Sequence, residues 1–197
     1  MGNSEIKNVL ITSPHATCIE EEEETRHTCD SITRSSAIIL ETKFKESPHG
    51  YTVYNIIGDV NRQICDLNRI ECRTTTGFRK KITKIYRKHN AAHDLWVWDV
   101  HSFPHRYSEQ HPVSECVLLV PPHGSAACYK FNHALVEYLQ DKGITVFALT
   151  GGINDITNEA VEHGYDRVFL LELNESNSSR RTRFILRYVV KWVETFS

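Results

Sequence analysis

Short apolar runs alternate with longer segments of mixed polarity along most of the chain. The apolar runs have the length of β-strands, and several are apolar at every position, as is typical of strands buried on both faces. We expect strands at residues 9–12, 52–57, 95–100, 116–120, 145–148 and 168–173, and a shorter one at 64–67.

The segments between these runs have the length and periodicity of helices. We expect helices over residues 30–44, 78–90, 126–141 and 180–196. Asp30 is a suitable N-cap for the first helix, and Gly143 is a suitable stop after the third. This alternation predicts an α/β protein, a three-layer α/β/α sandwich around a mostly parallel, mixed central sheet. The length suits a single domain over residues 1–197.

Polar residues cluster where three of the predicted strands end. Residues 9–12 lead into Pro14-His15, residues 95–100 lead into His101-Ser102, and residues 168–173 contain Glu172. Ligands of parallel α/β sheets bind beyond the carboxyl ends of the strands. These positions are therefore the first candidates for chemistry.

His15 and His101 follow different strands at the same expected edge of the sheet, so their side chains can converge. A catalytic zinc site needs about three ligands from His, Asp, Glu or Cys and one open position. Asp99 lies two positions before His101 on the same side of its strand and could orient that imidazole. The pattern favours a metal site.

The third ligand should come from residues 18–30, which follow His15. The candidates in this segment are Cys18, the glutamates from Glu20 to Glu24, His27, Cys29 and Asp30. His27 and Asp30 are three residues apart and share one face if the helix has begun. A rival hypothesis joins His15, Cys18, His27 and Cys29 in a closed structural zinc site, but that spacing matches no common zinc finger.

Composition narrows the range of partners and compartments. The formal net charge of −2 gives no whole-molecule attraction to nucleic acid or to an anionic membrane. No apolar run approaches the roughly 20 residues that span a bilayer, and the first residues lack the apolar segment of a signal peptide. We therefore expect a cytoplasmic protein with neither a nucleic-acid nor a membrane partner. Its six cysteines are expected to be free thiols.

Five short motifs follow one another along the chain. They are Ser13-Pro14-His15-Ala16, Arg26-His27-x-x-Asp30, Asp66-Leu67-Asn68-Arg69, Asp99-x-His101-Ser102-Phe103 and Glu172-Leu173-Asn174. In this order, from about residue 8 to residue 180, they resemble the motifs of N-formylglutamate amidohydrolases and their relatives. The resemblance implies a zinc-exopeptidase-like (phosphorylase/hydrolase-like) α/β fold.

The resemblance also implies roles for individual residues. His15 and His101 match metal ligands of the family, and Asp30 matches the acidic residue that completes the set, with His27 as the alternative. Glu172 resembles the general base, and Asn68 and Arg69 resemble residues that bind a substrate carboxylate or carbonyl. One Zn²⁺ per chain is expected, although a two-histidine, one-carboxylate set also suits other divalent metals.

These roles define a reaction. Zinc activates water and polarises the scissile carbonyl, and Glu172 takes the proton of that water and passes it to the leaving nitrogen. Arg69 can bind an oxyanion in a bidentate manner, and we expect Arg62 and Ser102 to contact the substrate as well. Arg79, at the start of a predicted helix, is expected on a solvated basic face.

The leading hypothesis is a zinc-dependent amidohydrolase that cleaves an N-acyl amino acid or a small peptide-like amide bearing a carboxylate. A second hypothesis is a catalytically silent relative that binds an acidic ligand or a protein partner through the same pocket. A third is hydrolysis of another bond, such as an ester or a peptidoglycan-type amide.

Overall fold

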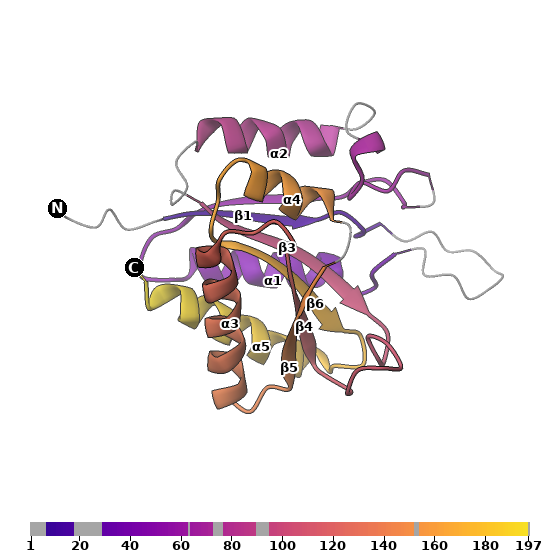
Figure 1. Ribbon diagram of the computed structural model, residues 1–197, viewed down its shortest axis with the longest axis vertical. Helices are drawn as coiled ribbons and strands as arrows, with labels where there is room; N and C mark the ends of the chain where they lie inside the picture. Colours follow the sequence, from indigo (N-terminus) through magenta and orange to yellow (C-terminus); the bar gives the residue numbers. More distant parts are fainter. Residues whose placement is uncertain are drawn as a thin grey trace.

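The computed structural model describes residues 7–17, 29–62, 64–72, 77–89, 95–151 and 154–196. It has six strands in one sheet, in the order β2-β1-β3-β6-β4-β5 (Figure 1). Their bounds are β1 Asn8–Ser13, β2 Thr52–Ile57, β3 Trp96–Phe103, β4 Cys116–Val120, β5 Val146–Thr150 and β6 Val168–Asn174. Only β4 and β6 pair antiparallel. The prediction of a mostly parallel, mixed sheet is confirmed.

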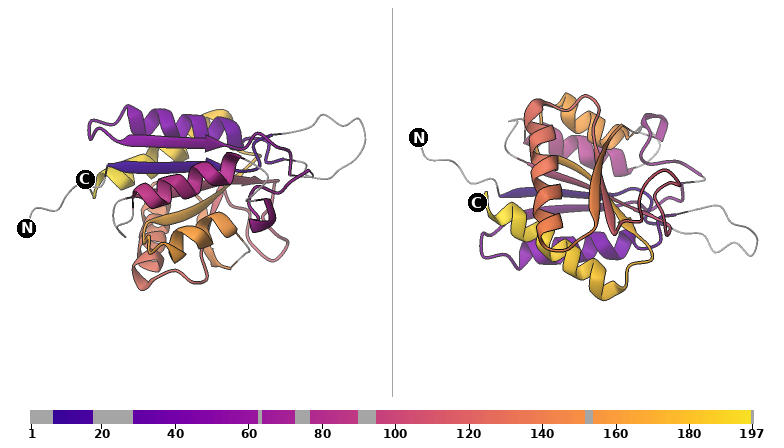
Figure 2. Two further views of the ribbon diagram at one scale, coloured as in Figure 1. Left: turned by 90° about the horizontal axis from the view of Figure 1, so that it is seen from above. Right: turned by 60° about the horizontal axis from the view of Figure 1, so that its bottom comes forward.

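Helices cover both faces of the sheet (Figure 2). Their bounds are α1 Thr33–Lys45, α2 Gly77–Lys88, α3 Ala126–Asp141, α4 Asp155–Glu162 and α5 Ser179–Glu194, with a 3₁₀ helix, η1, at Ile70–Cys72. The core on one face contains residues of α1, α3 and α5, and the core on the other contains residues of α2 and α4. The predicted three-layer α/β/α architecture is therefore confirmed.

The central strand β3 explains why both faces need helices. Successive residues of a strand point to opposite faces, and every residue of β3 is buried. Trp96 and Trp98 belong to the core on the α1 and α5 side, where Trp98 stacks on Phe169 with ring centroids 4.3 Å apart. Val97 belongs to the core on the α2 and α4 side. The first part of β3, residues 96–98, is thus apolar on both faces and packs against helices on each side of the sheet.

Three local predictions were wrong. The segment 64–67 is not a strand, because the amides of Ile64 and Cys65 bond back to the carbonyl of Asn61 and the next turn begins at Asp66. The first helix begins at Thr33 with Ile32 as its N-cap, so Asp30 is not the cap and its side chain is available elsewhere. Helix α4 was not expected, and its cap is Asn154.

The cysteines also differ from expectation. Cys65 and Cys72 form a disulfide, and Cys29 is disulfide-bonded too, whereas Cys116 and Cys128 are free and buried. The turn through η1 folds the chain back, so the Cα atoms of Cys65 and Cys72 lie 5.9 Å apart, within the range that a disulfide requires. The prediction of free thiols was therefore wrong for Cys29, Cys65 and Cys72, and it holds for Cys116 and Cys128. Cys18 lies outside the described residues.

None of the helices in the described ranges combines the length and apolar character that crossing a membrane requires.

Candidate metal centre

His15, Asp30 and His101 meet at the carboxyl ends of β1 and β3. His15 lies two residues beyond β1, His101 lies near the end of β3, and Asp30 precedes α1. All three are buried, and one ligand atom from each lies within 4.8 Å of the other two. The amide of Asp30 also donates to the carbonyl of His15, which fixes the approach of the two segments. This buried group could hold a metal ion.

Both imidazoles turn the same nitrogen towards one carboxylate oxygen. Asp30 Oδ2 lies 3.0 Å from His101 Nδ1 and 3.3 Å from His15 Nδ1. The rings meet edge to face with centroids 4.9 Å apart. His15 Nδ1 is buried and makes no hydrogen bond within the described part of the chain. The two Nδ1 atoms and Asp30 Oδ2 therefore define a common centre.

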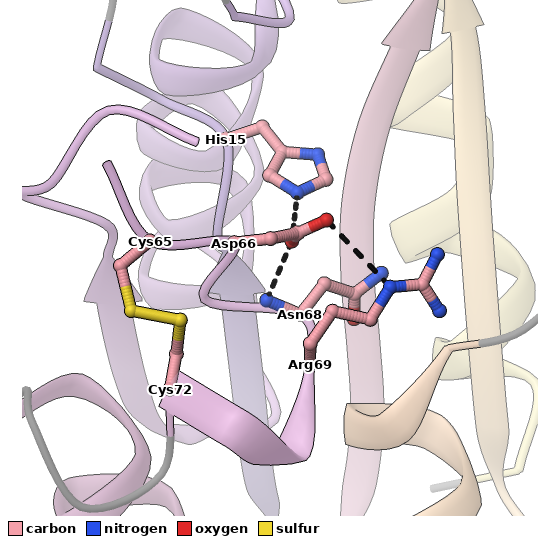
Figure 3. Close-up of a disulfide and its surroundings, with 6 residues drawn as sticks. All are labelled: His15, Cys65, Asp66, Asn68, Arg69 and Cys72. Atoms are coloured by element: carbon pink, nitrogen blue, oxygen red, sulfur yellow. Dashed lines mark hydrogen bonds and ion pairs between the residues drawn. A yellow bond between two sulfur atoms is a disulfide. The ribbon is translucent and has the colours of Figure 1, made fainter. Parts of the chain in front are cut away.

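A second carboxylate holds the other nitrogen of each ring. His101 Nε2 lies 3.0 Å from Asp99 Oδ2. His15 Nε2 lies 2.7 Å from Asp66 Oδ1, a contact drawn in Figure 3. Carboxylates in this position commonly fix the orientation of metal-binding histidines. The sequence pointed to Asp99 but missed Asp66, whose position in the Asp-x-Asn-Arg motif was the available signal.

Neighbouring opposite charges and hydrogen bonds outweigh burial in setting the pKa values of Asp30, Asp66 and His101. Burial alone would raise the pKa of Asp30, but the hydrogen bond to His101 and the interaction with His15 lower it well below its usual value. Burial opposes the charged form of Asp66 as well, yet its interactions with His15 lower its pKa to about 2. Burial also disfavours charge on His101, but the charge of Asp99 and the hydrogen bond to Asp30 raise its pKa well above the ordinary value. Anionic carboxylates thus surround the imidazoles, an environment that favours a cation.

Glu172 lies on β6 next to His101 on β3 in the parallel register. Burial raises the pKa of Glu172 to about 7, although the nearby His101 opposes the rise. Tyr107 lines the same pocket, and burial, followed by the charge of Glu172, raises its pKa to about 12. Glu172 can therefore exchange a proton near neutral pH, while Tyr107 keeps its proton.

A pocket of about 230 Å³ opens beside the three buried residues. The other residues predicted for substrate contact or catalysis also line it, namely Arg62, Asn68, Arg69, Ser102 and Glu172. His27, the alternative third ligand, lies outside the described residues.

The two arginines of the pocket lie near its carboxylates but at long distances. Arg69 Nε is 3.6 Å from Asp66 Oδ2, and Arg62 lies 3.8 Å from Asp30 and 3.9 Å from Asp66. Both side chains are about one-third exposed. Each can therefore turn part of its guanidinium towards an anion in the pocket.

Arg79 is not on a solvated face, so that prediction was wrong. Its side chain is buried, and its Nη2 bonds to Glu159 Oε2 at 2.7 Å. The unexpected helix α4 carries Glu159 and covers this part of α2.

Comparison with known proteins identifies the fold. No family model and no curated protein matches the chain. Among solved structures, the gene product Atu2144 of Agrobacterium tumefaciens is similar at 16% identity and a TM-score of 0.66, over 95% of this chain and 89% of that one. The N-formylglutamate amidohydrolase of Ralstonia eutropha JMP134 has 11% identity and a TM-score of 0.57, over 95% and 94%.

The pyrrolidone carboxyl peptidase of Thermococcus litoralis is similar to the same extent, with 9% identity and a TM-score of 0.56 over 96% of this chain and 94% of that one. At such low identity these likenesses show the fold alone. The chain is thus an α/β protein that shares its fold with an amidohydrolase and a peptidase, and it carries a buried His-Asp-His group at the carboxyl edge of its sheet.

Proposed function

We propose that this protein is a zinc-dependent hydrolase of carbon–nitrogen bonds that cleaves an N-acyl amino acid or a small peptide-like amide bearing a carboxylate. The observation that carries the proposal is the convergence of His15 Nδ1 and His101 Nδ1 on Asp30 Oδ2 beside a pocket that contains Glu172 and Arg69. The likeness to a structure named as an amidohydrolase and another named as a peptidase supports the same class of reaction.

The residues fit a zinc ion. Two imidazole nitrogens and one carboxylate oxygen are a common catalytic donor set, and the buried Nδ1 of His15 makes no hydrogen bond within the described residues. His15, Asp30 and His101 would hold the ion, with Asp66 and Asp99 orienting the two rings. When bound there, zinc supplies Lewis acidity, which polarises a carbonyl and makes water a better nucleophile near neutral pH.

Glu172 supplies the proton transfers. Its carboxylate faces the same pocket as the metal ligands, and its pKa of about 7 suits a group that must both accept and donate a proton. Glu172 takes a proton from the attacking water and delivers it to the leaving nitrogen. An amine is a poor leaving group without that proton, so this step decides whether the tetrahedral intermediate breaks down to products.

The polar wall of the pocket binds the rest of the substrate. Arg69 and Arg62 can each take a carboxylate or an oxyanion through a planar, bidentate guanidinium. The side-chain amide of Asn68 can donate its N–H groups to the same anion, while its buried carbonyl, which makes no hydrogen bond within the described residues, can accept one from an N–H of the substrate. Ser102 is already engaged, because its hydroxyl donates to Glu175. The carboxylate of the substrate is therefore expected beside Arg69 and Asn68.

The test combines metal analysis with hydrolysis. The purified protein loaded with zinc should hold about one zinc per chain, and it should hydrolyse members of a panel of N-acyl amino acids, peptides and esters. Removal of the metal with a chelator should abolish hydrolysis, and zinc should restore it. A metal-free protein with undiminished hydrolysis would contradict the proposal.

A matched pair of variants separates catalysis from metal binding. Glu172→Gln should keep the zinc but lose at least about 100-fold in kcat, because an amide neither accepts nor releases a proton near neutral pH. Glu162→Gln, on the exposed side of α4, should change neither the zinc content nor kcat. If Glu172→Gln hydrolyses amides at the normal rate, Glu172 is not the base. If no substrate is turned over but an acidic ligand binds through Arg69, the catalytically silent alternative holds.

A further inference from the structure

The disulfide between Cys65 and Cys72 closes residues 65–72 into a ring, here called the disulfide ring. The ring contains three side chains of the candidate site: Asp66, Asn68 and Arg69 (Figure 3). Asp66 follows Cys65 directly, and Arg69 is three residues before Cys72. All three side chains therefore lie between the two cysteines that the disulfide joins.

One carboxylate connects the ring to the buried His-Asp-His group. Asp66 Oδ1 lies 2.7 Å from His15 Nε2 and accepts a hydrogen bond from the backbone amide of Asn68 at 3.0 Å. Asp66 Oδ2 lies 3.6 Å from Arg69 Nε. The orientation of His15 and the position of Arg69 therefore both depend on where the ring holds Asp66.

The middle of the ring is anchored independently of the disulfide. Leu67 is completely buried in the core on the α2 and α4 side, and the carbonyl of Asn68 accepts a hydrogen bond from the amide of Asp155. These contacts keep the ring attached to the protein when the sulfur–sulfur bond is open. At the end next to Asp66, the amide of Cys65 bonds to the carbonyl of Asn61, and the disulfide ties the same residue to Cys72.

We propose that the Cys65–Cys72 disulfide is a redox-controlled clamp on the site: when closed it holds Asp66 against His15, and when reduced it loosens Asp66 and Arg69 and weakens metal retention. The part concerning metal rests on the proposed function. The part concerning the ring does not, because it is a statement about the order of residues 66–69.

The redox step needs a dithiol reductant. Its thiolate attacks Sγ of Cys65, which is the more exposed of the two residues, and displaces the sulfur of Cys72 as a thiolate. The second thiol of the reductant then displaces Cys65. The reductant leaves as a disulfide, and two electrons and two protons remain on the two cysteines. Disulfides in cytosolic proteins are usually catalytic or redox-sensing, so the proposal agrees with the cytoplasmic location expected from the sequence.

The test measures two quantities separately in the intact chain: the protection of backbone amides in the disulfide ring and the affinity for zinc. Hydrogen–deuterium exchange reports the amides of Asn68 and Arg69, which bond to Asp66 in the closed ring. Competition with a chromophoric chelator reports the dissociation constant for zinc. Both are measured before and after reduction, with alkylation and mass spectrometry to show that Cys65 and Cys72 carry free thiols.

Reduction should speed exchange at these two amides and weaken zinc binding about tenfold, within the range typical for loss of a carboxylate that orients a ligand histidine. Asp66→Asn should weaken zinc binding to a similar extent in the oxidised protein, and reduction should then have little further effect on the affinity.

The reductant can also open the disulfide at Cys29. The double variant C65S/C72S therefore shows which effects come from loss of the Cys65–Cys72 bond alone. It should behave as the reduced protein does, and further reductant should change neither measurement. If it fails to fold, C65A/C72A replaces it, and failure of both to fold would count against a clamp that opens in the native protein.

Full reduction of Cys65 and Cys72 with no change in exchange or affinity would overturn the proposal. Faster exchange in a protein that binds no zinc in either state would support the clamp and contradict the proposed function.

Discussion

The side-chain amide of Asn154 donates a hydrogen bond to Asp99 Oδ2 across 2.7 Å. The oxygen of the same amide accepts hydrogen bonds from the backbone of Ile156 and Thr157, the first turn of α4. One residue therefore caps a helix and fixes the carboxylate that holds His101. The orientation of His101 is coupled in this way to a helix on the α2 and α4 side of the sheet.

This coupling predicts a pH-dependent effect of Asn154→Asp. The change keeps an N-cap but removes the donor and places a second carboxylate against the buried Asp99. We expect the free energy of unfolding to fall by about 2–4 kcal/mol at about pH 8 and by less at about pH 5, since one carboxyl group then holds a proton. Asn154→Ser, which keeps the cap without adding charge, should cost about 1 kcal/mol at both pH values. Urea unfolding measures all four values, and an Asn154→Asp penalty independent of pH would contradict the coupling.

Glu172→Gln should change how the stability of the metal-free protein depends on pH. The pKa of Glu172 rises from 4.5 to about 7 on folding, so between these values the native state binds more protons than the unfolded state. Wild-type stability should fall as pH rises through this window, with a contribution from Glu172 of at most about 1.4 kcal/mol per pH unit. The Gln variant should lack that contribution. Chemical denaturation across the window tests this, and parallel curves for the two proteins would rule it out.

Gly58→Ala should disturb the turn that carries His15. A Cβ atom at residue 58 would lie 2.2 Å from the carbonyl oxygen of Pro14 and 2.8 Å from its carbonyl carbon. The backbone must move, so we expect a loss of about 1–3 kcal/mol in stability together with weaker zinc binding. Gly77→Ala is the control, because nothing lies within 4 Å of the added atom. Thermal unfolding and zinc titration of both variants check the prediction, which fails if the two behave alike.

The buried ion pair between Arg79 and Glu159 should be far more sensitive to removal of one partner than of both. Arg79→Met leaves the carboxylate of Glu159 in the interior without its guanidinium partner, and we expect a loss of about 3–5 kcal/mol. Replacing both residues by apolar side chains of similar volume, in Arg79→Met/Glu159→Leu, should recover most of that loss. A double-mutant cycle measures the coupling. Additive losses would show that the pair contributes little.

The sequence predicted the features that depend on periodicity. Uninterrupted apolar runs revealed the strands, and the rule that parallel strands present their carboxyl ends at one edge brought His15 and His101 together. The remaining features depend on contacts between distant residues. Asp66 meets His15 only because a turn without periodic pattern folds back, and the same turn joins Cys65 to Cys72. Helix α4 is too short to show a clear periodic pattern. Without that helix, the sequence offers no buried partner for Arg79, and Glu159 on α4 is the residue that binds it.

The place of β6 in the sheet has a consequence for how the chain acquires its pocket. β3 and β4 are consecutive in sequence, yet β6, which comes more than 60 residues after β3, lies between them. During synthesis from the N-terminus, the segment that carries His15 and His101 emerges long before Glu172. The β4–β5 pair has no place to attach to β3 until β6 arrives. We expect insertion of this strand to be a late and slow event in folding, since it depends on contacts far apart in sequence, and the pocket to gain Glu172 in the same step that joins the two halves of the sheet.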